Sequence, residues 1–133
     1  MSLIQFILLI SLFQTPETDT VVLSEGYLKL TRAPQSGDGQ YRMITHELTN
    51  PLRICVVDSS GIPVEGVEVH FSLLLQPDGS QGFILDPQIT YTDRNGYAGT
   101  KVILGTEPGD YQIVARINGL PGEDIQLFTV HAR

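Results

Sequence analysis

The sequence contains no tryptophan, only one cysteine and no cluster of basic residues. Because Cys55 stands alone, no disulfide can form within the chain, and cysteine usage does not indicate a redox compartment. The eight Lys and Arg residues are spread from Lys29 to Arg133, and the formal net charge is −7. Proteins that bind nucleic acid usually carry a basic patch for the phosphate backbone. We therefore expect no nucleic-acid partner.

The residue spacings of common active sites are also missing. His46, His70 and His131 form neither an HxH nor an HExxH pattern, and there is no Gly-x-Ser-x-Gly elbow of a serine hydrolase. The segment SGDGQ has glycines but lacks the strand-to-helix context of a phosphate cradle. We expect Cys55 to be an inert, buried or half-covered thiol. The sequence therefore predicts no enzymatic activity, no catalytic residue and no cofactor.

Four aspartates lie at the ends of predicted strands, and calcium takes carboxylate oxygens on loops as ligands. They are Asp58, Asp86, Asp93 and Asp110. No Asp-x-Asp-x-Asp-Gly loop occurs, and aspartate is a common turn former in its own right. We therefore predict no metal site.

The sequence has one long hydrophobic run, LIQFILLISLF, from Leu3 to Phe13, followed by the polar segment Gln14 to Thr20. It is similar to the apolar region of a secretion signal, although no Lys or Arg precedes it and no small-x-small cleavage site follows. As a helix, the run would reach about 16 Å, whereas the hydrocarbon core of a bilayer is about 30 Å thick. It cannot span a membrane alone.

Three interpretations of this run stay open: a signal peptide, a retained anchor or docking segment, and an extra strand of the domain. In the second case the run contacts a protein partner or the membrane. The side chains that we expect to make this contact are Leu3, Phe6, Leu9 and Phe13.

From Val21 onward, short runs of β-branched and aromatic residues are bounded by Gly, Pro, Asn and Asp, which is typical of an all-β sandwich. No amphipathic helix pattern is present. The predicted strands cover residues 21–31, 41–48, 52–58, 67–75, 88–92, 98–104, 110–118 and 125–132. We divide the chain into an apolar segment with a linker, residues 1–20, and one sandwich domain, residues 21–133, which is long enough to bury its own core.

Alternation along the strands predicts which side chains face the core. The predicted inward residues are Leu52, Ile54 and Val56 in one strand, Val67, Val69, Phe71 and Leu73 in the next, and Tyr111, Ile113, Ala115 and Ile117 in a third. Val114 is an apolar residue on the outer face. Tyr111, which follows Gly109 and Asp110, resembles a tyrosine corner, in which the ring fills the core and the hydroxyl binds backbone.

Two connecting segments make further predictions. TDRNGYAG places Asn95 and Gly96 where a β-hairpin needs residues that tolerate positive φ, with Asp93 bonding the loop backbone. GFILDP carries three consecutive apolar residues, Phe83, Ile84 and Leu85, so at least one must point outward if the segment is a strand. These three residues are a candidate contact patch for a partner.

The order of four short motifs resembles the bacterial immunoglobulin-like domain, group 1, of the invasin and intimin type. The motifs are LRICVVDSSGIPVEGVEVHFSL, TYTDRNGYAGTKVIL, PGDYQIVARING and LFTVHA, and they cover roughly Leu52 to Ala132. The matching positions are Asp58, Gly61, Pro63, Val64, Gly66, Val67, Val69, Phe71, Thr92, Asp93, Gly96, Ala98, Gly109, Tyr111, Ile113 and Ala115. The resemblance implies an immunoglobulin-like antiparallel β-sandwich.

The resemblance also implies a function: a non-enzymatic structural or protein-interaction module, exported to the periplasm or cell surface, whose partners are adjacent immunoglobulin-like domains. An alternative is an accessory subunit of a membrane complex, docked by residues 3–13. A third hypothesis is the accessory domain of a carbohydrate-active enzyme. That hypothesis predicts exposed aromatic platforms, whereas we expect most Tyr and Phe side chains to face the core.

Overall fold

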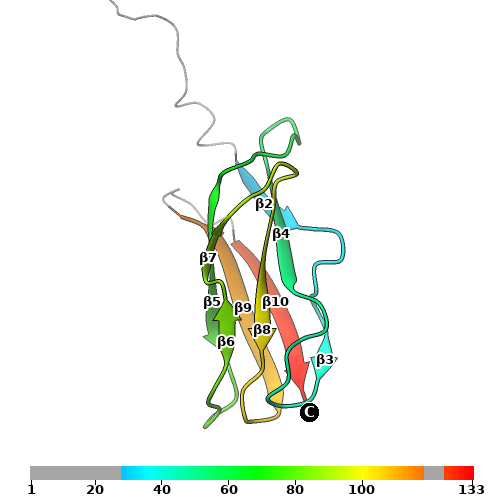
Figure 1. The fold of residues 1–133 in the computed structure, drawn as a ribbon, viewed down its shortest axis with the longest axis vertical. Helices are drawn as coiled ribbons and strands as arrows, with labels where there is room; N and C mark the ends of the chain where they lie inside the picture. The colour runs from blue at the N-terminus through cyan, green and yellow to red at the C-terminus, as the bar shows by residue number, and fades with distance from the viewer. Residues whose placement is uncertain (1–27, 119–124) are drawn as a thin grey trace, which may run out of the picture.

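The computed structural model describes residues 28–118 and 125–133, which form two β-sheets packed face to face (Figure 1). No helix occurs in this part of the chain, so the predicted all-β fold is confirmed. The strands are β2 (Lys29–Arg32), β3 (Tyr41–Arg42), β4 (Leu52–Val57), β5 (Glu68–Leu75), β6 (Ile84–Asp86), β7 (Ile89–Tyr91), β8 (Tyr97–Ile103), β9 (Gly109–Ile117) and β10 (Ile125–Ala132).

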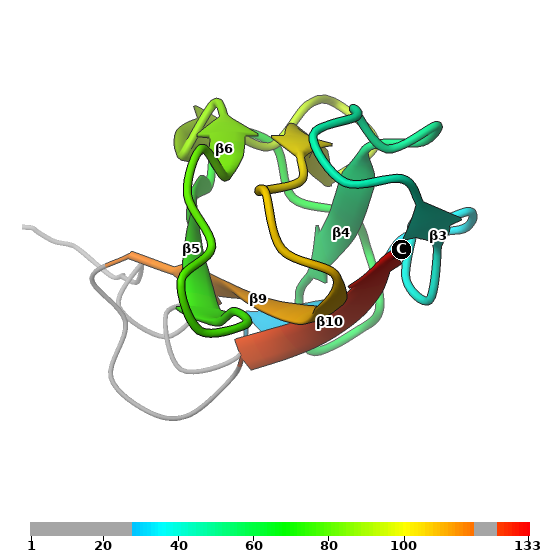
Figure 2. The ribbon, with the colours of Figure 1, turned by 90° about the horizontal axis from the view of Figure 1, so that it is seen from below.

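One sheet has five strands in the order β3-β10-β9-β5-β7, and the other has four in the order β2-β4-β8-β6. Neighbouring strands are antiparallel except β3, which runs parallel to β10. The end-on view of Figure 2 shows the two layers. The chain changes sheet between β2 and β3 at one side and between β6 and β7 at the other. Both sides of the sandwich are therefore bridged by continuous chain.

The core lies between the inner faces of the two sheets, and the predicted alternation in β4, β5 and β9 is confirmed. Leu52, Ile54 and Val56 are fully buried, whereas the residues between them are half-buried. Val114 is buried too, although it lies on the outer face, because its cross-strand neighbours there are Ser72 on β5 and Leu127 on β10. On its outer face β9 therefore buries Val114, whereas Arg116 on the same face is exposed.

Tyr111 is fully buried at the start of β9, and its hydroxyl is satisfied as a tyrosine corner requires. The hydroxyl donates a hydrogen bond to the Glu107 carbonyl at 2.8 Å and lies 2.5 Å from Ser80 Oγ. The Phe83 ring stacks on the Tyr111 ring with centroids 5.4 Å apart. At Gly105, an added Cβ would lie 2.9 Å from the Tyr111 hydroxyl. The glycine therefore leaves room for this buried polar contact.

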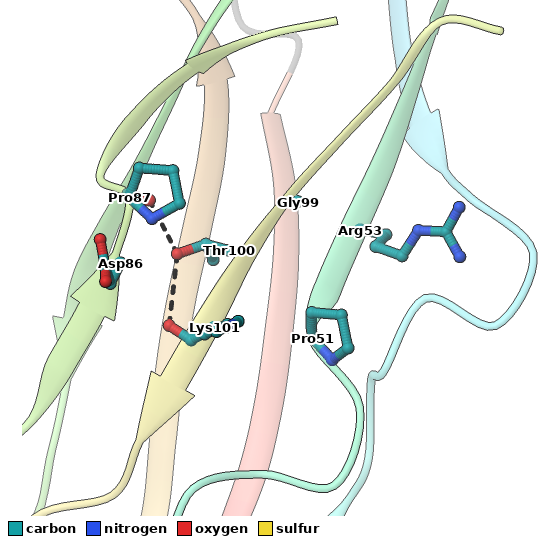
Figure 3. Close-up of a pocket in the computed structure, with 7 residues that line it drawn as sticks. All are labelled: Pro51, Arg53, Asp86, Pro87, Gly99, Thr100 and Lys101. Carbon is teal, nitrogen blue, oxygen red and sulfur yellow. Dashed lines mark hydrogen bonds between the residues drawn. The ribbon is translucent and has the colours of Figure 1, made fainter. Parts of the chain in front are cut away.

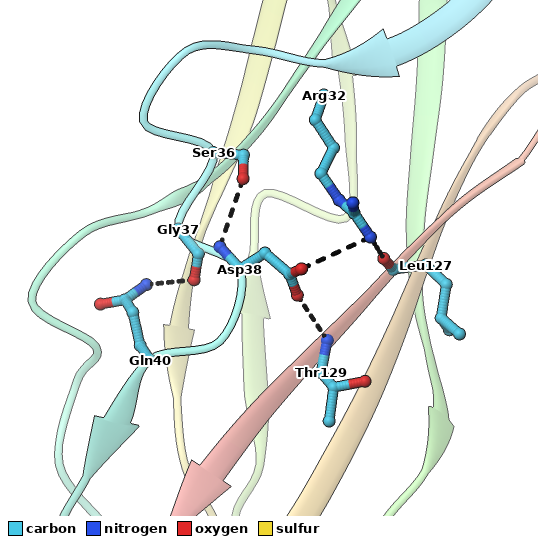
Figure 4. A network of polar contacts seen from close by, with 7 residues as sticks. All are labelled: Arg32, Ser36, Gly37, Asp38, Gln40, Leu127 and Thr129. Atoms are coloured by element: carbon cyan, nitrogen blue, oxygen red, sulfur yellow. Dashed lines mark hydrogen bonds and ion pairs between the residues drawn. The ribbon is translucent and has the colours of Figure 1, made fainter.

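A polar network closes the edge of β10 beyond its short pairing with β3 (Figure 4). Arg32 Nη2 donates to the Leu127 carbonyl at 2.7 Å, and Asp38 Oδ1 accepts from the Thr129 amide at 2.9 Å. The Gly39 amide donates to the Thr129 carbonyl, and Arg32 and Asp38 form an ion pair at 3.4 Å. The segment between β2 and β3 therefore covers backbone groups that an open sheet edge would expose.

Two predictions about strands need correction. Residues 41–48 were predicted as one strand, but β3 ends at Arg42, and Thr45 has a φ of 64° in a turn closed by the bond from the His46 amide to the Met43 carbonyl. The segment then joins the other sheet, where the Leu48 amide donates to the Val102 carbonyl. A strand at Ile84–Asp86, absent from the predicted set, forms the edge beside β8.

The predicted hairpin at TDRNGYAG is also wrong as a hairpin, although its turn forms. Asp93 Oδ1 accepts from the amides of Asn95 and Tyr97, and Gly96 has a φ of 79°. The flanking strands β7 and β8 belong to different sheets, because β7 pairs with β5 and β8 pairs with β4 and β6. The turn therefore connects the two layers.

Tyr111→Phe is expected to lower the free energy of unfolding by about 1–3 kcal/mol, because it leaves the Glu107 carbonyl and Ser80 without their buried partner. Urea unfolding measures this change. Tyr41→Phe, at a tyrosine with 59% of its surface exposed, is the matched control and should be nearly neutral. Equal losses in the two variants would contradict a role for the buried hydroxyl.

Asp38→Ala is expected to speed amide hydrogen exchange at Thr129 and to lower the free energy of unfolding by about 1 kcal/mol, since it removes the acceptor of that amide. Asp78→Ala, in an exposed turn, serves as the control. Unchanged protection of the Thr129 amide in the Asp38 variant would contradict the edge-closing role.

Candidate interaction surface

The three histidines are held by different neighbours and do not meet. His70 Nε2 lies 2.6 Å from Glu68 Oε2, His131 Nδ1 lies 2.7 Å from Asp110 Oδ1, and His46 contacts a backbone carbonyl. Across residues 28–118 and 125–133, no group of three or more His, Cys, Asp or Glu side chains is arranged to hold a metal ion.

Two of the four aspartates considered for calcium, Asp58 and Asp93, bind amides of their own loops, and Asp110 contacts His131. Asp58 Oδ1 accepts from the amides of Ser60 and Ile62, and Asp93 Oδ1 accepts from the two amides of its own turn. These carboxylates therefore stabilise turns, as Asp commonly does.

Cys55 lies half-buried on the outer face of β4, as predicted. Burial raises the pKa of its thiol, and the negative charge of Asp93 raises this pKa further. Since the thiolate is the reactive form, both effects make Cys55 a poor nucleophile.

The outer face of the five-stranded sheet carries exposed apolar side chains, and we call it the apolar face. Across one row of the sheet lie Ile89, His70, Arg116 and Ile125, and across the next lie Ser72, Val114 and Leu127. Exposed fractions are 51% for Ile89, 43% for Ile125 and 38% for Leu127. Tyr91, Leu74 and Leu75 add exposed apolar surface at β7 and at the β5 irregularity. Interface cores combine such apolar and aromatic side chains with few charges.

A polar cluster centred on Glu68 borders the apolar face. Its carboxylate accepts from Asn118 Nδ2 at 2.8 Å and from the Tyr91 hydroxyl at 3.4 Å, in addition to the contact with His70. The hydrogen bond with His70 is the main reason that the pKa of Glu68 lies below its ordinary value. The cluster holds the side chains of Tyr91 and His70 beside Ile89.

The residues predicted as a contact patch are divided between different environments. Phe83 is half-buried against Tyr111, Leu85 is buried in the core, and Ile84 is exposed on the outer face of β6. The cause is the alternation of a strand, since neighbouring residues point to opposite faces. A contact role for Ile84 stays a prediction. Leu3, Phe6, Leu9 and Phe13 lie outside the described residues.

The expectation that Tyr and Phe mostly face the core is wrong for tyrosine. Tyr41, Tyr91 and Tyr97 lie on outer faces, and in the described residues only Tyr111 is a core tyrosine. Tyr41 stacks on His131, and Tyr97 lies under the Arg53 guanidinium. The three rings stand on β3, β7 and β8, so they do not form one platform.

The apolar face itself was missed by sequence reasoning. The alternation predicts whether each side chain faces inward or outward, but only the cross-strand register places Ile89 and Ile125 in one row. In the described residues no helix is long and apolar enough to cross a membrane.

The two packed sheets, antiparallel except for β3, the tyrosine corner and the sheet change between β2 and β3 define an immunoglobulin-like β-sandwich. Solved structures with this fold include the Yersinia pseudotuberculosis adhesin InvE, at 15% identity and a TM-score of 0.63, covering 80% of this chain and 32% of that one. Invasin, a bacterial integrin-binding protein, matches at 21% identity and a TM-score of 0.51, covering 80% of this chain and 18% of that one.

The D0-D1 domain of intimin matches at 14% identity and a TM-score of 0.54, covering 79% of this chain and 47% of that one. The chain therefore spans less than half the length of these three structures. The likeness confirms the predicted invasin and intimin type of immunoglobulin-like fold. The sequence matches no protein-family profile and no curated protein.

Glu68→Gln is expected to lower the thermal unfolding midpoint at neutral pH and to lose this effect on acidification. Because the folded-state pKa of Glu68 is depressed, its ionised carboxylate stabilises the fold above the ordinary pKa of 4.5, and that stabilisation is lost as pH falls through the lower folded value. Unfolding midpoints between pH 3 and 7 measure the difference.

Glu65→Gln removes the same charge from an exposed loop and is the control. A difference between wild type and Glu68→Gln that persists unchanged at pH 3 would contradict the role of the ionised carboxylate.

Proposed function

We propose that this chain is a non-enzymatic protein-interaction module of the adhesin type, exported to the bacterial cell envelope. The observation that carries the proposal is the apolar face, which leaves Ile89, Ile125 and Leu127 exposed on one sheet. Because about half of each of these side chains is already covered, burial of the rest against a partner contributes about 1 kcal/mol each, so several together can hold a protein.

The fold supports the choice of an interaction module. InvE is an adhesin and invasin binds integrin, and in both cases this chain matches only a part of the longer structure. We propose protein partners of the same broad kind for this chain, either adjacent immunoglobulin-like domains or a membrane complex. The location proposed is the periplasm or the cell surface.

An alternative is that the chain is an accessory subunit of a membrane complex. The apolar run Leu3 to Phe13 favours this function, because a retained run would dock into lipid or into a partner. In both functions the sandwich contacts protein, but only the second requires residues 3–13 in the mature molecule.

The two functions are separated by mild detergent extraction from the native host, size-exclusion chromatography and intact mass. An adhesin-type module should lose about the first fifteen residues, as expected of a secretion signal. Retention of residues 3–13, with release only by detergent, would replace it with the docked subunit.

The contact itself is tested with Ile89→Ser combined with Leu127→Ser. We expect wild type to co-elute with an envelope protein and this double variant to elute alone. Ile62→Ser combined with Met43→Ser removes similarly exposed apolar side chains from loops and should still co-elute. Loss of co-elution in both double variants, or in neither, would contradict the apolar face as the contact.

A further inference from the structure

The outer face of the four-stranded sheet, opposite the apolar face, contains a hollow of about 280 Å³ (Figure 3). Its lining includes Pro51 and Arg53 at the start of β4, Asp86 at the end of β6 with Pro87 after it, and Gly99 and Lys101 on β8. We propose that this hollow binds an extended acidic peptide segment of a protein partner, with an apolar residue over Gly99 and carboxylates toward Arg53 and Lys101.

The hollow exists because β8 has no side chain at its middle. Gly99 lies directly opposite Arg53 in the β4–β8 ladder, and an added Cβ would lie 3.0 Å from both Arg53 Cγ and the Leu52 carbonyl oxygen. The half-buried backbone of β8 at Gly99, with the Arg53 methylene groups beside it, therefore forms the floor. An extended peptide can approach such a floor more closely than a sheet face covered by side chains.

Two proline rings form apolar rims of the hollow, and a hydrogen bond from the core side holds one of them, Pro87, in place. Pro51 and Pro87 stand on either side of β8, and the Thr100 hydroxyl donates to the Pro87 carbonyl at 2.7 Å (Figure 3). Because Thr100 points into the sandwich, it supports the rim without filling the hollow. A small apolar side chain of the ligand would contact these two rings.

The charged side chains of the lining favour an acidic ligand. Arg53 lines the hollow with its side-chain stem, its guanidinium lies 5.0 Å from the centroid of the Tyr97 ring, and Figure 3 shows the side chain extending away from Gly99. Within residues 28–118 and 125–133, neither Arg53 nor Lys101 forms an ion pair. Asp86 is the one carboxylate in the lining, so the hollow has an excess of positive charge in a chain of net charge −7. Carboxylates complement this pair of cations.

The probe is the capped peptide Gly-Glu-Pro-Glu-Gly, titrated into the ¹⁵N-labelled full chain and followed by NMR at low salt. We expect saturating shifts at the amides of Gly99 and Lys101, and about fivefold weaker binding after Arg53→Gln combined with Lys101→Gln. Gly99→Ala should weaken binding by filling the hollow. Arg94→Gln combined with Arg133→Gln removes equal charge outside both proposed surfaces and should leave the dissociation constant unchanged.

Three results would overturn the proposal: no shift at Gly99, equal binding of the Gln-Pro-Gln peptide, or equal weakening in the two charge variants. A fourth result would overturn it by showing that the acidic residues Glu17 and Asp19 of the chain itself are the ligand of the hollow. If Glu17→Gln combined with Asp19→Gln moves the Gly99 resonance without added peptide, those residues occupy the hollow in place of a partner. The hollow and the apolar face lie on opposite sheets. Failure of the peptide titration would therefore not count against the apolar face, and failure of the co-elution test would not count against the hollow.

Discussion

The register of β9 is the constraint on which both faces of the five-stranded sheet depend. β9 pairs with β10 on one edge and with β5 on the other. The hydrogen bond from the Tyr111 hydroxyl to the Glu107 carbonyl holds the Tyr111 side chain inward near the start of the strand. A shift by one residue would turn every inward side chain outward. The same register that buries Ile113 and Ala115 sets Val114 between Ser72 and Leu127 on the opposite side. The apolar face is therefore positioned by the core.

Local patterns in the sequence predicted the strands whose two faces differ in polarity. β4, β5 and β9 alternate clearly, and Tyr111 was identified as a corner from its neighbours alone. Sheet membership was not predictable in the same way, because the turn at Asp93 has the chemistry of a hairpin whether or not its flanking strands pair. The strand β6 is only three residues long, too short for alternation to separate Leu85 from its exposed neighbour Ile84.

The candidate surfaces were harder to predict than the fold for a physical reason. Each is assembled across strands that are distant in sequence, so neither Ile89 with Ile125 nor Arg53 with Lys101 forms a local motif. The sandwich presents two chemically different outer faces: an apolar one on the five-stranded sheet and a glycine-floored, cation-flanked one on the four-stranded sheet. Two faces of different chemistry suit a module that contacts more than one protein segment.

The most direct test of the central claim, that the apolar face contacts protein, is site-specific photo-crosslinking in the native host. Leu127 is replaced by the photoreactive residue p-benzoylphenylalanine, and the same replacement at Ile62 is the control, since both side chains are exposed but only Leu127 lies on the apolar face. The account predicts one discrete crosslinked protein from position 127 and none from position 62. No crosslink from position 127, or the same products from both positions, would contradict it.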